Sequence, residues 1–199
     1  LFANSPLPHG NRIGVFAPSG GAGVIMADKC EENGLELVEL SSPTKESLSK
    51  LMPAFGSMFN PFDCTAQGYG SPDSMLACLD VFVRDENFDT ILVQIPTVSG
   101  PFAATLAEGI VKARQLTDRA YAALCTSGAS SEPAYQVFRE NNVPYFNSFS
   151  NCFRAIGSAA KYFRRLNSDP STTVTPGVSD GSLQQARAWL GAQDTAATE

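Results

Sequence analysis

Short apolar runs alternate along the chain with segments in which apolar residues recur every three or four positions. The apolar runs predict strands at residues 12–17, 36–40, 90–96, 120–125 and 143–146. The run TILVQIP at residues 90–96 is apolar enough for a strand that is buried on both faces. The pattern therefore predicts a series of strands separated by helices.

Helical periodicity fills the intervals between the predicted strands. Pro72 and Asp73 open the clearest of these helices, in which apolar residues fall on one face. Further helices are predicted at residues 23–34, 42–52, 102–115, 132–141 and 149–165. Strands that alternate with helices form parallel sheets covered on both faces. We therefore expect an α/β fold, a flavodoxin-like three-layer sandwich with a mainly parallel five-stranded sheet.

The character of the sequence changes after Leu166. Residues 167–182 contain almost no large apolar side chains, which is typical of a linker. The segment SLQQARAWLGAQ that follows is long enough for only one short amphipathic helix. We therefore expect one domain at residues 1–166 and a flexible C-terminal tail at residues 167–199 that leads towards a missing domain.

Composition and charge exclude several classes of protein. Hydrophobic residues make up 43% of the 199 residues, which is enough for a core and excludes a wholly disordered chain. Charged residues make up 17%, below the roughly 25% of an average soluble domain, so we expect part of the surface to be covered. The formal net charge of −6 argues against a nucleic-acid-binding domain, which normally carries a basic stripe.

The sequence also indicates where the protein is located and whether it binds a metal. No apolar run reaches the about 18 to 20 residues that a membrane-spanning helix needs. The first residues lack the build of a signal peptide, and the chain begins with Leu1, as a fragment or processed chain would. Five cysteines without a CxxC pair are typical of reduced thiols, and a single histidine, His9, makes a metal site unexpected. We therefore expect a cytoplasmic protein without a bound metal.

A glycine-rich turn connects the first predicted strand to the first predicted helix. It consists of Ser19, Gly20, Gly21, Ala22 and Gly23. Small residues at the carboxyl end of a parallel strand let backbone N–H groups reach an anion at the helix N-terminus. The turn is therefore a candidate phosphate-binding site, although small residues equally suit close packing of a helix on a strand. It is neither a Walker A loop nor a GxGxxG motif.

Two further turns carry polar residues that are candidates for lining a site. Ser127 and Gly128 follow the predicted strand at residues 120–125, where hydroxyl or N–H groups are available. Asn60 and Asp63 belong to the sequence NPFD, which is typical of a turn. In both cases a purely structural turn is the favoured interpretation. Cys125 is interpreted as a core residue, because no histidine is placed to activate it as a nucleophile.

The order of these segments is similar to that of one protein family. PLPHGNRIGVFAPSGGAGVIMADKCEENGLELVELS, followed by FGSMFNPFDCTAQ, ILVQIP and NNVPYFNSFSNCFRAIGSAAKYFRR, resembles the second CoA-ligase domain of the NDP-forming (ADP-forming) acyl-CoA synthetases. The resemblance implies a flavodoxin-like, succinyl-CoA synthetase-like domain at residues 1–166. It also implies a ligase that joins a carboxylate to CoA with ATP, through an acyl phosphate and a phosphohistidine.

The resemblance further implies residue roles and partners. Gly20, Gly21, Ala22 and Gly23 would help to hold the phosphoryl group, whereas the phosphohistidine belongs to a loop of another domain, so no catalytic residue is expected in this chain. ATP with Mg²⁺ and CoA are implied for the full-length enzyme, and none is expected to bind this chain alone. The implied partners are a CoA-binding domain, the first ligase domain and an ATP-grasp module, in an oligomer when intact. No nucleic acid or membrane is expected as a partner.

Two departures from the family leave alternatives open. The loop histidine and the ATP-grasp module are missing, so the isolated chain is expected to be inactive and to belong to a larger ligase. A catalytically inactive regulatory or scaffold module of a synthetase-like protein is the alternative function. A nucleotide- or flavin-binding flavodoxin is disfavoured, because a hydroxyl-rich phosphate loop is missing. Substrates in the family range from acetate and aryl acids to dimethylsulfoniopropionate, whose thioester then undergoes elimination.

Overall fold

Five short strands form one parallel sheet. Their bounds are β1 Arg12–Phe16, β2 Glu36–Leu37, β3 Thr90–Ile95, β4 Ala120–Cys125 and β5 Tyr145–Phe146. The strand order is β2-β1-β3-β4-β5, and every pair of neighbours is parallel. This is the order of a flavodoxin-like sheet, so the predicted fold class is confirmed.

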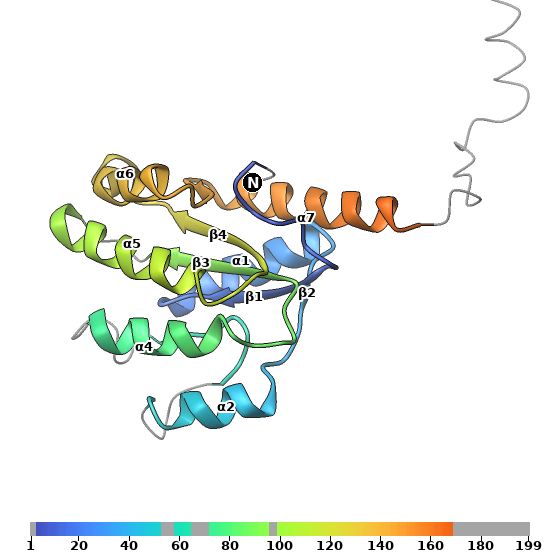
Figure 1. The fold of residues 1–199 in the computed structure, drawn as a ribbon, viewed down its shortest axis with the longest axis horizontal. Coiled ribbons are helices and arrows are strands. Elements are labelled where there is room, and N and C mark those ends of the chain that lie inside the picture. Colours follow the sequence, from blue (N-terminus) through green and yellow to red (C-terminus); the bar gives the residue numbers. More distant parts are fainter. Residues whose placement is uncertain (1–2, 53–57, 65–71, 96–98, 169–199) are drawn as a thin grey trace, which may run out of the picture. The chain divides into compact units, whose positions relative to one another are not determined.

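The computed structural model describes residues 3–52, 58–64, 72–95 and 99–168 (Figure 1). The helices and strands lie in a compact unit that ends at Leu166. The tail predicted at residues 167–199 falls outside the described residues, except for its first two positions. None of the helices within these described ranges is long and apolar enough to cross a membrane.

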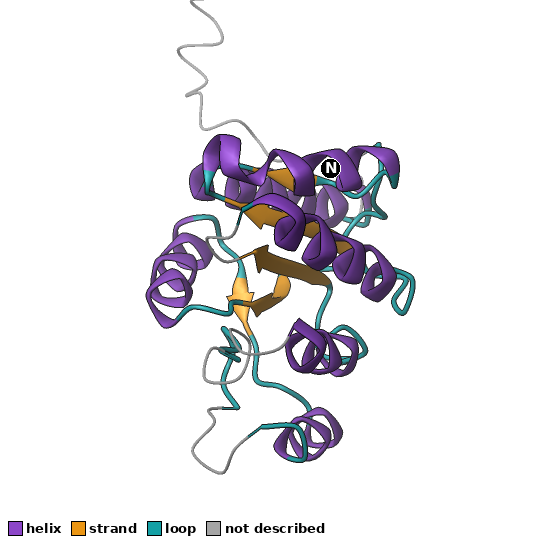
Figure 2. Cartoon of the chain, turned by 90° about the vertical axis from the view of Figure 1, so that its left-hand side faces the viewer, coloured by secondary structure: helices purple, strands orange, loops and turns teal. Residues whose placement is uncertain are grey.

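Six α-helices and one 3-10 helix occur in the described part of the chain. They are α1 Gly20–Glu32, α2 Ser42–Ser49, α4 Pro72–Phe82, α5 Gly100–Arg114, η1 Gly128–Ser131, α6 Glu132–Glu140 and α7 Phe149–Leu166. Helices α1 and α7 pack on one face of the sheet, whereas α4, α5 and α6 pack on the other, which makes three layers (Figure 2). Helix α2 packs beside α4.

The sheet separates two apolar cores, because side chains along a strand alternate between its faces. Ile91 and Val93 of β3 face the core under α4, α5 and α6, whereas Leu92 faces the core under α1 and α7. Strands β3 and β4 are buried along their whole length, as predicted for the run at residues 90–96.

The outer strands are shorter than the sequence pattern predicts. Strand β2 stops at Leu37 rather than at residue 40, and β5 covers only the last two of its predicted residues. Beyond β2, the carbonyl oxygen of Val38 accepts a hydrogen bond from the side chain of Asn60 instead of pairing with a strand. A side chain from a distant segment therefore lies between β1 and the residue after β2, where the strand pairing would otherwise continue.

Helix α1 begins earlier than the sequence predicts, at Gly20 rather than Gly23. Ser19 precedes it in an extended conformation, with φ −169° and ψ 114°. The Gly23 N–H donates to the Ser19 carbonyl oxygen at 2.9 Å, which closes the first turn of the helix. The glycine-rich segment is therefore helical, and the connection from β1 consists only of residues 17–19.

Candidate functional site

The candidate site lies at the carboxyl end of β1, where the chain enters α1. Strands β1 and β3 are neighbours, but the helices that follow them, α1 and α5, pack on opposite faces of the sheet. Ligands of doubly wound sheets bind at the carboxyl ends of the strands where the connections diverge in this way. The predicted glycine-rich turn lies at this point of the fold.

The first turn of α1 has backbone N–H groups that the helix does not use. The first helical bond runs from Gly23 to Ser19, so the N–H groups of Gly20, Gly21 and Ala22 precede it. Gly20 and Gly21 are exposed, and the Ser19 side chain makes no capping hydrogen bond. No acidic residue belongs to this first turn. The N–H groups and the helix dipole together suit an anion.

The glycines of this turn serve different purposes. A Cβ built on Gly23 would lie 3.6 Å from the Cβ of Pro61 and 4.0 Å from that of Ala17, so Gly23 allows the helix to pack closely. A Cβ built on Gly21 would meet no atom within 4 Å. Packing therefore explains Gly23 but not Gly21, which is open to the approach of a ligand.

Asn60 holds its segment against β1. Its Nδ2 donates hydrogen bonds to the carbonyl oxygens of Ile13 at 2.7 Å and Val38 at 2.9 Å. Its Oδ1 accepts a hydrogen bond from the N–H of Val15 at 2.9 Å. Because both ends of the Asn60 amide bind backbone groups, this residue positions its neighbours and does not face a ligand.

Asp63 lies at the N-terminus of α1. The preceding residue, Phe62, forms a parallel bridge with Phe16 at the end of β1. A Cβ built on Gly20 would lie 3.1 Å from Oδ2 of Asp63, so the carboxylate lies against the first turn of the helix. A carboxylate is stabilised in this place by the helix dipole. The structure thus brings the predicted residues Gly20 and Asp63 together, and the site combines N–H donors with one carboxylate.

Ser127 and Gly128 form a separate turn at the end of β4. Strand β3 lies between β4 and β1, so this turn is two strands, about 10 Å, from the first turn of α1. Gly128 has φ +59°, a conformation that favours glycine, and Ser127 makes no capping hydrogen bond to η1. The backbone conformation accounts for Gly128 without a ligand.

Gln94 is a polar residue near the site that the sequence pattern did not single out. It is the penultimate residue of β3 and is only 4% exposed. Its Nε2 donates to the carbonyl oxygen of Ile95 at 2.5 Å, whereas its Oε1 has no hydrogen-bond partner among the described residues. The sequence pattern does not indicate a role for Gln94, because the apolar run that contains it, TILVQIP, predicts only a strand.

The cysteine thiols are buried, including that of Cys64, which follows Asp63 in the chain, and the histidine lies away from this site. All five thiols are buried, and burial raises the pKa of Cys125 to about 12, which confirms its interpretation as a core residue. His9 stacks on Phe163 with ring centroids 5.3 Å apart. Together with Arg12 and Ala120 it lines a hollow at the amino ends of the strands, at the opposite edge of the sheet from Gly21.

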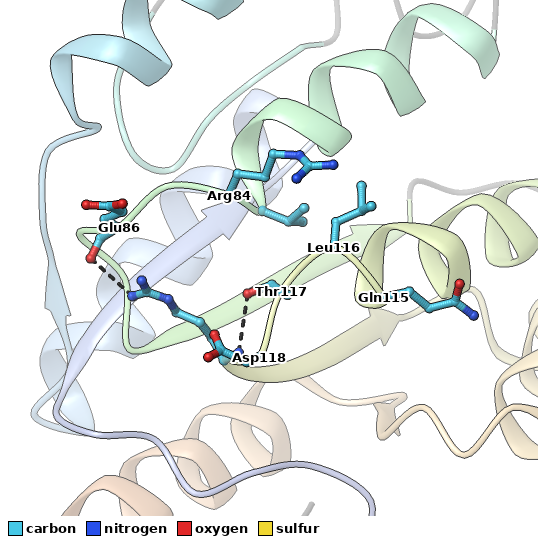
Figure 3. A pocket seen from close by; sticks show the side chains of 8 residues that line it. Arg84, Glu86, Gln115, Leu116, Thr117 and Asp118 are labelled. Atoms are coloured by element: carbon cyan, nitrogen blue, oxygen red, sulfur yellow. Dashed lines mark hydrogen bonds between the residues drawn. The ribbon is translucent and has the colours of Figure 1, made fainter.

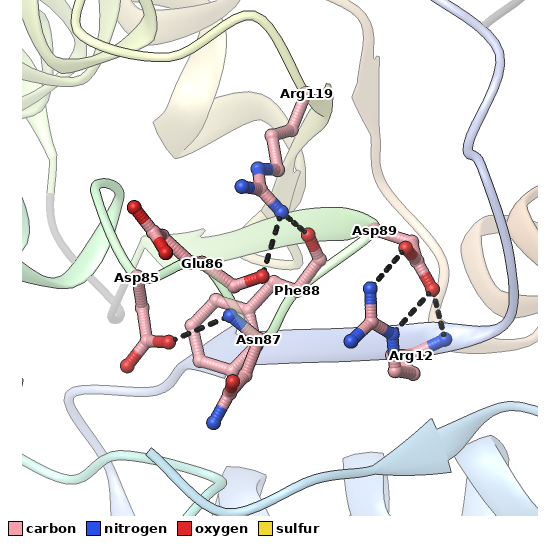
Figure 4. Close-up of polar contacts among 7 residues, drawn as sticks. All are labelled: Arg12, Asp85, Glu86, Asn87, Phe88, Asp89 and Arg119. Carbon is pink, nitrogen blue, oxygen red and sulfur yellow. Dashed lines mark hydrogen bonds and ion pairs between the residues drawn. The ribbon is translucent and has the colours of Figure 1, made fainter. Parts of the chain in front are cut away.

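A second hollow, of about 490 Å³, lies at the same amino edge (Figure 3). Arg84, Glu86, Leu116 and Arg119 are among its lining residues. The Arg119 guanidinium donates to the carbonyl oxygens of Glu86, at 3.1 Å, and of Phe88 (Figure 4). These contacts tie loops to the ends of β3 and β4. Because ligands of such sheets bind at the carboxyl edge, we place the candidate site at α1.

Sequence comparison connects the chain to a described family. Residues 13–166 match the Ligase-CoA domain. The alpha subunit of an ADP-forming acetate–CoA ligase II from Pyrococcus furiosus is 32% identical over 145 residues, which are 71% of this chain and 31% of that protein. An ADP-forming acetate–CoA ligase I from Archaeoglobus fulgidus is 28% identical over 152 residues, 75% of this chain and 21% of that protein. The chain thus spans about a third or less of these relatives.

Structure comparison finds the same fold in archaeal proteins. A crystal structure of a protein from Pyrococcus horikoshii aligns with a TM-score of 0.73 at 25% identity, over 83% of this chain and 38% of that one. A dinucleotide-forming acetyl-coenzyme A synthetase 1 from Candidatus Korarchaeum cryptofilum aligns with a TM-score of 0.67 at 22% identity, over 83% of this chain and 38% of that one.

Proposed function

The chain belongs to the Ligase-CoA domain family, and from this premise we propose that it forms one domain of an ADP-forming acyl-CoA synthetase. The complete enzyme would join a carboxylate to CoA and convert ATP to ADP and phosphate. The relatives named as ADP-forming acetate–CoA ligases support this proposal. Because the chain spans only 31% of the first of them, the other parts of the reaction belong to domains outside it.

Within that enzyme the first turn of α1 holds a phosphoryl group on its way between an acyl phosphate and a phosphohistidine of another domain. The open approach to Gly21, beside N–H groups that the helix does not use, carries this proposal. Donors fixed at a helix N-terminus stabilise phosphoryl oxygens even in a chain of negative net charge. The chain's own contribution is to bind and orient that group.

The carboxylate of Asp63 limits what this turn can hold. It lies against Gly20, so it repels a bare anion that approaches the same N–H groups. A group that also carries a hydrogen-bond donor overcomes this repulsion, because the donor can face the carboxylate. The imidazole N–H of a phosphohistidine is a donor of this kind. Asp63 therefore favours a phosphoryl group carried on a protein side chain over free phosphate.

In this proposal, other domains of the enzyme bind CoA and bind ATP with its Mg²⁺. Among the described residues, no group of three His, Cys, Asp or Glu side chains is placed to hold a metal ion. The turn Ser19–Gly23 also lacks the Lys-Ser/Thr pair with which a Walker A loop binds nucleotide phosphates and Mg²⁺. The residues present suit a phosphoryl group and do not suit a nucleotide with its metal.

Substitution of Gly21 in the full-length enzyme tests the phosphoryl site. In Gly21→Glu the added carboxylate repels the phosphoryl group, and loss of such stabilisation is expected to slow phosphohistidine formation about a hundredfold. The melting temperature should change little, because the position is exposed with open space around it. Gly21→Ala is the matched control and should retain activity. A Gly21→Glu enzyme that is phosphorylated at the parental rate would contradict a phosphoryl site at the first turn of α1.

The isolated chain provides a second test. Without a loop histidine or a nucleotide-binding module, residues 1–199 should release no ADP from ATP in the presence of CoA and a carboxylate. A coupled assay for ADP measures this directly. CoA-dependent ADP release by the isolated chain would show that the chain catalyses the complete reaction. It would contradict the proposal that other domains are required.

A further inference from the structure

Helix α7 is positively charged in a chain that is acidic elsewhere. It contains four basic residues and no acidic one, namely Arg154, Lys161, Arg164 and Arg165 (orange in Figure 1). The rest of the chain contains all twenty acidic residues and only ten of the fourteen basic ones. The distribution of charge is therefore strongly uneven, with a positive helix on one face of a negative protein.

The charges of α7 gather on its exposed side. The opposite side packs on the sheet through small and apolar side chains, which are Cys152, Phe153, Ile156, Gly157, Ala159 and Ala160. Arg154, Ser158, Lys161 and Arg165 recur every three or four positions and are all exposed, so they form one line along the helix. We call these four residues the α7 stripe.

Ion pairs within the described part of the domain do not account for this stripe, although Arg154 Nη2 donates a hydrogen bond to Oδ1 of Asn151 at 2.8 Å. Several basic residues elsewhere pair with carboxylates, namely Arg12, Lys29, Lys45, Lys50 and Arg139. Arg154, Lys161 and Arg165 form no ion pair with any carboxylate in the described ranges. The helix dipole accounts for Arg165 in the last turn, but it gives no benefit to Arg154, which lies in the N-terminal half.

We propose that the α7 stripe docks on an acidic surface of another domain or subunit of the same enzyme. Charge complementarity supports an acidic partner, and the exposed Tyr162 and Leu166, at 49% and 58%, add the aromatic and apolar area common in interfaces. The net charge of −6 disfavours a nucleic acid. The proposed function supplies only the identity of the partner, and the charge argument is independent of it.

Zero-length coupling with a carbodiimide tests this docking on the native protein isolated with its natural subunits. The reagent joins a lysine amine to a carboxylate in direct contact. We expect Lys161 to be joined to an Asp or Glu of another domain or subunit, outside residues 1–199, identified by mass spectrometry of the peptides. Lys45 with Glu39 and Lys50 with Glu46, at 2.8 and 2.9 Å, are internal positive controls in the same sample.

Several results would overturn the proposal. Lys161 could remain uncoupled while both control pairs react, or it could couple only to carboxylates within residues 1–199 of its own chain. In a sample that mixes two isotopic forms, coupling of Lys161 to residues 1–166 of a second copy would assign the stripe to self-association instead. Protection of Lys161 by added duplex DNA at physiological salt would assign it to nucleic acid. Each of these outcomes contradicts a partner domain.

A charge-reversal variant that keeps Lys161 as the reporter completes the test. In Arg154→Glu with Arg165→Glu, we expect coupling of Lys161 to the partner to fall about tenfold, because like charges then face each other. The conservative pair Arg154→Lys with Arg165→Lys should retain it. Arg84→Glu with Lys112→Glu, at exposed sites outside α7, is the matched control and should also retain it.

The coupling yield distinguishes docking from the proposed chemistry. It is measured without any assay of acyl-CoA formation. A protein that forms no acyl-CoA but couples Lys161 to another domain would contradict the proposed function and support the docking. Equal yields in the charge-reversal and control variants would overturn the docking and leave the phosphoryl site untouched.

Discussion

Asp89 receives three hydrogen bonds from a single residue, Arg12, across the amino ends of β3 and β1 (Figure 4). The backbone N–H and Nε of Arg12 both donate to Oδ2 at 3.0 Å, and Nη2 donates to Oδ1 at 2.8 Å. The Asp89 side chain is 7% exposed and that of Arg12 is 45% exposed. The pair therefore fixes β1 beside β3 at the edge of the sheet opposite the candidate site.

Removing the charge of Asp89 should destabilise the domain. In Asp89→Asn an amide nitrogen faces donors of Arg12, so at least one hydrogen bond to a charged group is lost and a nearly buried group is left without a partner. We expect a loss of about 2 kcal/mol in the free energy of unfolding, measured with urea at pH 7. Glu46→Gln, which breaks an exposed ion pair with Lys50, should leave the midpoint unchanged.

The same pair predicts a dependence on acid. Burial alone raises the pKa of Asp89, but the hydrogen bonds and charge of Arg12 outweigh it, so this pKa lies below its ordinary value. A carboxyl with a lowered folded-state pKa stabilises the protein above its unfolded pKa of about 4, and this stabilisation is lost as the pH falls through the folded value. The stability difference between the parent and Asp89→Asn should therefore shrink below about pH 4. A constant difference down to pH 2 would contradict the assignment.

Gly157 marks a close approach between α7 and the residue that follows α1. A Cβ at this position would lie 2.7 Å from the backbone carbonyl oxygen of Asn33. Alanine in a helix interior normally gains about 1 kcal/mol over glycine, but overpacking against backbone costs about 1 to 3 kcal/mol. We expect the Gly157→Ala protein to melt at a lower temperature than the parent. Ser158→Ala, one residue later on the exposed side, should not, and an unchanged melting temperature for Gly157→Ala would show that the helices can shift apart.

Gln94 should be less favourable for stability than an apolar residue. Its Oε1 is buried without a partner among the described residues, and leaving such an acceptor unsatisfied costs about 1 to 3 kcal/mol. Gln94→Leu fits the apolar strand and is expected to raise the free energy of unfolding by about 1 kcal/mol. Gln115→Leu, at an exposed position, is the control and should have no comparable effect. A destabilised Gln94→Leu protein would reveal a polar partner of Oε1.

The strands and helices are predictable from the sequence because packing reinforces patterns that each segment already carries. Strand β4 has the bounds predicted for it, and α7 ends one residue beyond its predicted end. The placement of the glycine-rich turn at the carboxyl end of β1 also follows from the order of the segments. The tail and the domain boundary remain predictions.

Contacts between distant segments are what the sequence pattern does not contain. Asn60 looks like a turn residue, yet its amide binds β1 at positions 47 and 45 residues earlier. The approach of Asp63 to Gly20 depends on that contact, and the neighbours of Gln94 depend on which helices cover β3. The helical start of α1 at Gly20 was also missed, because glycines indicate a loop unless the capping geometry of Ser19 is known.

Both outer strands of the sheet, β2 and β5, are only two residues long. The edge of a sheet offers unpaired N–H and C=O groups on which strands from other molecules can grow, and long flat edges are the starting points of amyloid-like aggregation. The edge strands of the native fold thus expose few backbone N–H and C=O groups on which a fibril could grow. Aggregation on heating should therefore begin from unfolded chains.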